Sequence, residues 1–370
     1  MKINFLGQLV DVPRIRIGYI GCGSHSRRNV LPSLKFASVE LVAICDLSAE
    51  KAEAFAKEFG FERHYDNHIA MIESENLDAV FIVTGYDGAT RPLYPALAKD
   101  CLKRGLHVWV EKPPSASVKE LLEVKALSAK MNKQFAVGFK KMFASANEKA
   151  KELSELPEFG GIAMSMLQYP QHVPLKEDFD RYLAGEAMWN VASFLDHICH
   201  PISLLLMLMG MPKTLFYERS AAGTGAANFT FADGSLATLA LTGGASMNGG
   251  MERTFILSNK GGHITVENNF RVSLHKNPPG LSYGNSPTFY LGAPGETTAV
   301  WEPEMSLGQL YNKGLFLLGY YKQVEDFVAA VLENKPMAKG GVDDAIYATA
   351  IFEAFAQGPG KVIDLACYAG

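Results

Sequence analysis

The sequence has few cysteines and no excess of positive charge, and both shortages narrow the classes of protein that it can encode. The five cysteines, at positions 22, 45, 101, 199 and 367, show no C-x-x-C pattern and no paired spacing. An odd number of scattered cysteines indicates reduced thiols and a cytoplasmic location, not a disulfide framework. The formal net charge is −4, which gives no electrostatic case for a nucleic-acid partner.

The sequence also lacks a long apolar run. The longest mainly apolar segment, residues 201–211, is too short to cross a bilayer, and residues 1–7 have no extended apolar stretch of the signal-peptide kind. We therefore expect no membrane partner. With 370 residues, of which 48% are hydrophobic and 20% charged, the chain can bury a large core and is long enough for two domains.

Glycine is present where a dinucleotide-binding unit needs it. The apolar segment at residues 15–20 leads into Gly21-Cys22-Gly23, and a helical pattern starts near Arg27. Glycine lets the backbone approach a pyrophosphate, and the start of a helix offers it free amide groups. Ser24 and His25 belong to the same turn, so we expect Gly21, Gly23, Ser24 and His25 to contact a cofactor.

An acidic residue follows the next apolar segment. Residues 39–45 read as a strand and end at Asp46, whose carboxylate can accept hydrogen bonds from ribose hydroxyls and would repel a 2′-phosphate. The sequence therefore predicts NAD as the cofactor and makes NADP less favoured. Ser26 replaces the third glycine of the usual G-x-G-x-x-G pattern, but it is small enough for close packing. The alternative is a glycine turn that binds nothing, which the flanking strand, helix and Asp46 make less attractive.

The chain changes character after residue 140. Residues 1–140 alternate apolar segments with helical patterns, which predicts an NAD-binding domain built on a doubly wound parallel Rossmann sheet. Residues 141–370 predict an α+β domain for substrate binding and oligomerisation, with an open, mostly antiparallel sheet and closing helices able to pack back on the first domain. The fold class is thus α/β. The expected elements of the second part are a loop over 171–186, a helix over 190–209 kinked or interrupted near Pro201, hairpins over 227–241 and 254–267, a loop over 277–309, and helices over 320–333 and 343–356.

Two neighbouring strands are followed by residues that can carry chemistry. Thr84 follows the apolar segment 79–83, and Glu111-Lys112-Pro113 follows the segment 107–110. The carboxyl edge of a parallel sheet is where ligands bind in such folds. Lys112 can polarise a carbonyl or hold a hydroxyl whose carbon gives up hydride, and Thr84, Glu111 and Lys112 are candidate cofactor contacts. A surface lysine after a strand is an equally ordinary interpretation.

The apolar helix carries an acid and a histidine one turn apart. Asp196 and His200 share a helix face, and both are costly to bury without partners. In the catalytic interpretation His200 takes a hydroxyl proton, while Asp196 orients His200 or holds a second substrate hydroxyl. A core histidine satisfied by its acidic neighbour is the structural alternative. Metal chelation by Asp196 and His200 is another alternative. No third ligand residue lies at a spacing typical of metal sites, so no metal is predicted.

Taken together, these motifs resemble the Gfo/Idh/MocA family of NAD(P)-dependent oxidoreductases, which includes inositol dehydrogenases and glucose–fructose oxidoreductase. The similar segments are Gly21-Cys22-Gly23, Asp46, Glu111-Lys112-Pro113, Gly138-Phe139-Lys140 and Asp196-x-x-x-His200. The resemblance covers nearly the whole chain. It implies a dehydrogenase that acts on CH–OH groups of a polyol, such as a sugar, a sugar derivative or a cyclitol. It also implies that Lys112, Asp196 and His200 are catalytic, and that the protein is a homodimer or homotetramer.

Some positions depart from the family pattern. Residues 84–94 form a longer stretch than usual, with Tyr94 near the usual histidine position, and Ser203 stands where a second acid is common. Two other functions remain open. An NAD-dependent glycosidase of the same fold would share the cofactor half, whereas a non-enzymatic NAD-sensing regulator would not need Lys112, Asp196 and His200 together.

Overall fold

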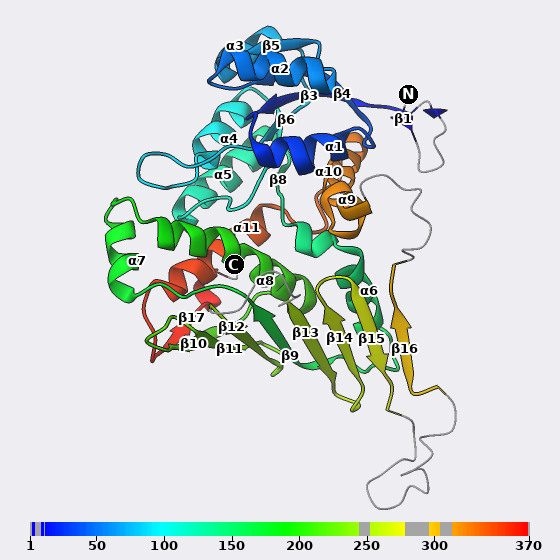
Figure 1. The fold of residues 1–370 in the computed structure, drawn as a ribbon, viewed down its shortest axis with the longest axis vertical. Helices are drawn as coiled ribbons and strands as arrows, with labels where there is room; N and C mark the ends of the chain where they lie inside the picture. Colours follow the sequence, from blue (N-terminus) through cyan, green and yellow to red (C-terminus); the bar gives the residue numbers. More distant parts are fainter. Residues whose placement is uncertain are drawn as a thin grey trace, which may run out of the picture.

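The computed structural model of the protein contains two large sheets, one in the upper and one in the lower half of the molecule as drawn in Figure 1. The structure describes residues 2–3, 9–10, 12–243, 252–277, 296–303 and 313–368. Two short strands near the N-terminus, β1 (Lys2–Ile3) and β2 (Leu9–Val10), pair with each other. The remaining strands belong to a six-stranded and a nine-stranded sheet.

The first sheet is entirely parallel and has the order β5-β4-β3-β6-β7-β8. Its strands are β3 (Ile15–Ile20), β4 (Val39–Cys45), β5 (Arg63–Tyr65), β6 (Ala79–Ile82), β7 (His107–Val110) and β8 (Phe135–Val137). All residues of β6, β7 and β8 are buried, as expected for parallel strands covered on both faces. The strand order reverses between β3 and β6, which makes the carboxyl edge there a ligand crevice. The predicted Rossmann sheet is confirmed.

Helices connect these strands. They are η1 (Ser26–Val30), α1 (Leu31–Leu34), α2 (Ala49–Phe59), α3 (His68–Ser74), α4 (Tyr94–Lys103) and α5 (Val118–Met131). The helix predicted from about Arg27 begins as a wider π-turn, in which the Leu31 amide bonds the Ser26 carbonyl. Pro32 follows at once; it has no amide hydrogen and its ring crowds the preceding turn, which disfavours ordinary α-helical bonding there.

The second sheet is open and mostly antiparallel, as predicted. In chain order its strands are β9 (Ile162–Tyr169), β10 (Thr214–Arg219), β11 (Gly225–Thr230), β12 (Leu236–Leu241), β13 (Arg253–Ser258), β14 (His263–Glu267), β15 (Arg271–His275), β16 (Thr298–Trp301) and β17 (Val362–Asp364). Only the pair β9–β12 is parallel among these strands. Burial alternates along β11 and β13, because one face is covered and the other is open.

Helices α6 (Ser145–Ser154), α8 (Trp189–Met209) and α11 (Val342–Phe355) pack against this sheet: α6 on β14 and β15, α8 on β9 and α11 on β10 (Figure 1). The other helical segments after β8 are η2 (Lys140–Phe143), α7 (Lys176–Leu183), α9 (Lys313–Leu317), α10 (Tyr320–Glu333) and η4 (Ala366–Tyr368). Helix α8 is long and apolar enough to cross a membrane by length and composition alone, but 72% of its most apolar window is buried inside the protein. It is therefore the central core helix of this half.

Helix α10 turns back to the first sheet. Its residues Val324 and Phe327 share a buried cluster with Ile17 of β3, and the Phe327 ring meets Phe81 of β6 edge-on with 5.4 Å between centroids. The end of the chain thus contributes to the core under the parallel sheet.

Two expected loops in the second half were wrong. Residues 171–186 are not all loop, because α7 forms there and buries Phe179 and Tyr182 completely. The helix expected over 190–209 is present as α8, and it is not interrupted at Pro201. The predicted loop at 277–309 contains strand β16, which pairs with β15; residues 278–295 and 304–312 lie outside the described part of the chain.

Candidate active site

The glycine turn after β3 is shaped by contact with the neighbouring strand. Gly21 has φ +108°, and a Cβ there would lie 2.0 Å from the carbonyl oxygen of Val83, so only glycine fits. Gly23 differs, because a Cβ on it would meet nothing within 4 Å. The space above Gly23 is therefore open, and the first amides of the following helix have no intrahelical acceptor. This is the cradle that a pyrophosphate requires.

Ser26 stabilises this turn from inside. Its hydroxyl donates to the Gly21 carbonyl over 2.7 Å, and the residue is fully buried. The serine that replaces the usual third glycine thus keeps helix and strand in close contact.

Asp46 lies beside the turn at the end of β4. Its Oδ2 accepts a hydrogen bond from the Cys22 amide (2.8 Å) and its Oδ1 one from the Ser48 amide (3.0 Å). Each carboxylate oxygen keeps further acceptor capacity. The residues of the cradle thus suit a dinucleotide, with Asp46 placed to accept from a ribose.

His25 and Glu111, both expected to contact a cofactor, contact each other. The distance from Nε2 of His25 to Oε1 of Glu111 is 3.1 Å, and the Asn29 side-chain amide lies 3.2 Å from Nδ1. This arrangement assigns the ring proton to Nε2. Glu111 is buried, its Oε2 accepts from the Lys112 amide, and a Cβ at Gly138 would lie 2.9 Å from Oε1. Glu111 is thereby fixed beneath the turn.

Lys112 forms an ion pair across the cleft. Its Nζ is 2.7 Å from Oδ1 of Asp196 on α8, and the Tyr86 hydroxyl donates to the same oxygen over 3.1 Å. Burial alone would lower the pKa of Lys112, but the carboxylates of Asp196 and Glu111 outweigh it and hold the pKa above its ordinary value. Lys112 is thus a fixed cation at neutral pH.

These residues surround one cavity of about 180 Å³ at the carboxyl edge of the parallel sheet. This volume is far larger than the ~10–15 Å³ that one water needs, so it suits a small organic molecule or part of a larger one. The lining residues are His25, Val83, Thr84, Tyr86, Tyr94, Glu111, Lys112, Pro113 and Asp196. The cavity therefore joins the predicted cofactor residues to Lys112 and Asp196.

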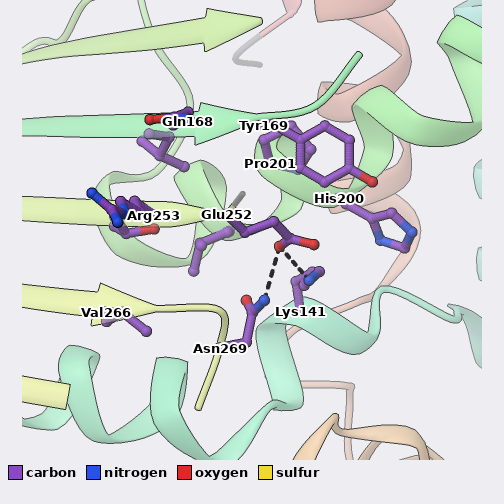
Figure 2. Close-up of a pocket in the computed structure, with 12 residues that line it drawn as sticks. Lys141, Gln168, Tyr169, His200, Pro201, Glu252, Arg253, Val266 and Asn269 are labelled. Atoms are coloured by element: carbon purple, nitrogen blue, oxygen red, sulfur yellow. Dashed lines mark hydrogen bonds and ion pairs between the residues drawn. The ribbon is translucent and has the colours of Figure 1, made fainter. Parts of the chain in front are cut away.

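His200 faces a different, smaller cavity (Figure 2). That cavity measures about 10 Å³, enough for about one water. The expected pairing of Asp196 with His200 is not present, since Asp196 bonds Lys112 and Tyr86 instead. Within the described chain the His200 ring has no hydrogen bond, although Tyr169 lies beside it with 6.0 Å between ring centroids. Burial, and next the charge of Lys112, hold the pKa of His200 well below its ordinary value.

A polar network that the sequence did not reveal lines the same small cavity. Figure 2 shows Glu252 between Lys141 and Asn269; the lysine forms an ion pair with Glu252, and the Asn269 amide donates to it over 2.8 Å. Lys141 is buried, so this pairing compensates its charge. In the sequence, the only indication of this network was that Lys141 directly follows the Gly138-Phe139-Lys140 segment.

Tyr86 is the other functional candidate that sequence reasoning missed. The unusual length of residues 84–94 was visible, but nothing marked Tyr86 as a partner of Asp196. Among the residues that the structure describes, no group of three or more His, Cys, Asp or Glu side chains could hold a metal ion.

Comparison with known proteins agrees with the parallel sheet and its expected cofactor class. Residues 15–139 match the model of an oxidoreductase family with an NAD-binding Rossmann fold. D-xylose 1-dehydrogenase (NADP(+)) 2 of Haloferax volcanii is 26% identical over 206 residues, which are 54% of this chain and 58% of that protein. Myo-inositol 2-dehydrogenase of Thermotoga maritima is 23% identical over 337 residues, 89% of this chain and 92% of that protein.

The fold has solved counterparts. A dehydrogenase from Chromobacterium violaceum superposes with a TM-score of 0.76 at 21% identity, covering 94% of this chain and 96% of that one. This likeness concerns the fold. The chain spans little more than half the length of the D-xylose dehydrogenase that it matches.

Proposed function

We propose that this chain, which belongs to the Gfo/Idh/MocA family of oxidoreductases, transfers a hydride between a CH–OH group of a polyol and a nicotinamide cofactor. The observation that carries the proposal is the Lys112–Asp196 ion pair, at 2.7 Å, in a cavity that begins at the glycine turn. A fixed cation and an acceptor next to a dinucleotide cradle are what alcohol oxidation requires.

The cofactor is proposed to be NAD. Gly21, Gly23, Ser24 and His25 would hold the pyrophosphate side, and Asp46 would accept from the adenosine ribose. Thr84, Glu111 and Lys112 would lie on the nicotinamide side. When bound, the nicotinamide supplies the hydride acceptor for the carbinol carbon. NADP is less favoured, because the Asp46 carboxylate would repel a 2′-phosphate.

Lys112 stabilises the oxygen of the substrate as it gains negative charge. Its ammonium is held by Oδ1 of Asp196 and is shielded, with only 15% of the side chain exposed. A charge–charge interaction in such a setting is stronger than in water. Lys112 therefore lowers the barrier for oxidation of the hydroxyl that it contacts.

His200 is proposed as the proton acceptor. Its lowered pKa keeps the ring neutral at neutral pH, as a base must be. The water-sized cavity beside it lies next to Lys141 and Tyr169. The hydroxyl proton would leave the substrate in this direction, while Asp196 holds a second hydroxyl.

The substrate is proposed to be a sugar, a sugar derivative or a cyclitol. The names of the relatives, D-xylose and myo-inositol dehydrogenases, and the cavity of about 180 Å³ support a small polyol. Residues 1–140 would serve as the NAD domain of a cytoplasmic enzyme, and residues 141–370 as the substrate and oligomerisation domain. A homodimer or homotetramer would pair the open sheet faces, where Met166 and Leu236 are 42% and 47% exposed.

A spectrophotometric screen tests the proposal. Purified protein is mixed with NAD, or separately NADP, and a panel of pentoses, hexoses, their acids and inositols, and absorbance is followed at 340 nm. We expect NADH formation with at least one polyol. Tight NAD binding without reduction by any panel member would refute the proposed reaction.

A further inference from the structure

The segment between β6 and α4, residues 83–93, forms a closed loop. The Asp87 amide donates to the Arg91 carbonyl over 2.8 Å, and the Asp87 carboxylate accepts from the amides of Ala89 and Arg91. Tyr86 and Pro92 form an isolated antiparallel bridge. These bonds give the loop a defined shape of its own.

The loop is also tied to the second half of the protein. The guanidinium of Arg91 donates to the Tyr182 carbonyl over 2.7 Å, and the Tyr182 hydroxyl donates to the Thr90 carbonyl over 3.2 Å. The Met188 amide, just before α8, donates to the Thr90 hydroxyl. The loop thus spans from the parallel sheet to α7 and α8, and this fixes Tyr86 at the cleft.

Tyr86 uses this position to hold Asp196. Its hydroxyl and the ammonium of Lys112 both bond Oδ1 of Asp196, at 3.1 and 2.7 Å. The Tyr86 ring meets Trp189 edge-on, with 5.8 Å between centroids. Burial first, and then the Asp196 charge, raise the pKa of Tyr86 far above its ordinary value, so the hydroxyl remains a donor at any working pH.

The other carboxylate oxygen of Asp196 is left available. Nδ1 of His197 lies 3.8 Å from Oδ2, but that nitrogen is 2.8 Å from the Ser193 carbonyl and donates there. Among the described residues Oδ2 has no hydrogen bond, and the Asp196 side chain is 25% exposed. Because the Tyr86 hydroxyl and the Lys112 ammonium both hold Oδ1, the carboxylate has a fixed orientation. Its Oδ2 can then accept a hydrogen bond from a ligand hydroxyl.

We propose that Tyr86 is a positioning residue of this site: together with Lys112 it fixes Oδ1 of Asp196, so that Oδ2 is presented to a substrate hydroxyl. The identity of that hydroxyl rests on the dehydrogenase function proposed above, whereas the positioning of Asp196 does not. The loop at 83–93, tied to α7, is the structural device that places the tyrosine.

The first experiment uses cofactor-free protein labelled with carboxyl-¹³C aspartate. The Asp196 carboxyl signal is identified by its loss in Asp196→Asn, and its chemical shift is compared between wild type and Tyr86→Phe at neutral pH. Because the chemical shift of a carboxyl carbon depends on the hydrogen bonds that its oxygens accept, Tyr86→Phe should move this signal. The matched control, Tyr217→Phe, removes a buried tyrosine hydrogen bond to the Phe355 carbonyl, away from Asp196 and the loop, and should leave the signal in place.

A second measurement approaches the same bond from the tyrosine. In protein labelled with ¹³Cζ tyrosine, Asp196→Asn should shift the Tyr86 signal and leave that of Tyr182 in place. This measurement does not depend on how well Tyr86→Phe folds. An unchanged Tyr86 signal in Asp196→Asn, an unchanged Asp196 signal in Tyr86→Phe, or an equal change of the Asp196 signal in Tyr217→Phe would overturn the proposal.

Kinetics with myo-inositol or D-xylose as probes separate this inference from the function on which it rests. If wild type is active, Tyr86→Phe should lower kcat/KM about tenfold or more with the NAD affinity unchanged, and the control Tyr217→Phe should stay within about twofold. Equal losses in both variants would refute the positioning role. If none of the polyols leads wild type to reduce NAD, the proposed function fails, and the NMR measurements still decide the role of Tyr86.

Discussion

The ammonium of Lys112 and the carboxylate of Asp196 lie 2.7 Å apart, although 84 residues separate them in the chain. Lys112 follows β7 of the parallel sheet, and Asp196 lies on α8, the core helix of the other half. The two side chains are only 15% and 25% exposed. The pair thus joins the two halves of the molecule at the cavity that His25 of the glycine turn also lines.

The two glycines of the turn should respond differently to alanine. Gly21→Ala forces a Cβ to within 2.0 Å of a backbone oxygen at a φ of +108°, so we expect a loss of at least about 2–3 kcal/mol in the free energy of unfolding. Gly23→Ala has open space around its Cβ and should unfold like wild type, yet lose NAD binding about tenfold or more. Denaturant titration and calorimetry test both. Normal NAD affinity in Gly23→Ala would place the pyrophosphate elsewhere.

Asp46 should decide the choice of cofactor. Asp46→Ser removes the charge that would repel a 2′-phosphate and an acceptor for the ribose, so we expect NAD affinity to fall about tenfold while NADP affinity holds or rises. Asp66→Ser serves as the control, because Asp66 is an exposed acid after the neighbouring strand β5. An unchanged NAD-to-NADP ratio of dissociation constants in Asp46→Ser would contradict the assignment.

The pH dependence of oxidation should follow His200. A general base must be neutral, so kcat/KM falls when the pH drops through the pKa of the histidine. Because burial and the nearby Lys112, Lys141 and Lys140 lower that pKa, the acid limb should lie below pH ~6.5 and the profile should be flat around neutrality. His200→Asn should lose most activity and this limb. An acid limb centred above pH 7 in wild type would argue against His200 as the base.

His107 should make the fold sensitive to acid. Burial, followed by the charge of Lys133, lowers the pKa of His107 to about 4, and its Nδ1 accepts from the Gln134 amide. The unfolded chain, with a histidine pKa near ~6.5, binds the proton first, so stability present above pH ~6.5 is lost as the pH falls toward 4. The loss should reach about 1–3 kcal/mol. His107→Asn, measured by urea unfolding at pH 7 and 4.5, should show a smaller difference between the two pH values; an equal difference would contradict this origin.

Much of the fold was predictable because periodicity is a local property. The strands at Ile15–Ile20 and Val39–Cys45 and the helix at Tyr320–Glu333 match the expected bounds. Helix α7 was missed because its eight residues, KEDFDRYL, are mostly charged. Its stability comes from Phe179 and Tyr182, which pack into a core that local sequence does not reveal.

The sequence singled out several residues that line the candidate site, but not the pairs that they form. Lys112 and Asp196 each stood out, yet the four-residue spacing suggested Asp196 with His200. A shared helix face makes two side chains neighbours, but the partner that an acid selects depends on which cations the tertiary fold brings near. Asp196 forms its ion pair with Lys112, and His200 lines the small cavity beside Lys141. The role of Tyr86 could not be predicted from the sequence, because the position of its side chain depends on the loop 83–93, which is anchored to α7.

The most direct test of the role of Lys112 compares wild type with Lys112→Met at saturating NAD and the polyol that wild type oxidises fastest. We expect kcat to fall at least about 100-fold, because the fixed cation proposed to lie at the reacting oxygen is lost, while calorimetry shows an NAD affinity within a few-fold of wild type. A Lys112→Met enzyme that binds NAD and retains kcat within a few-fold of wild type would contradict the central role of the Lys112–Asp196 pair.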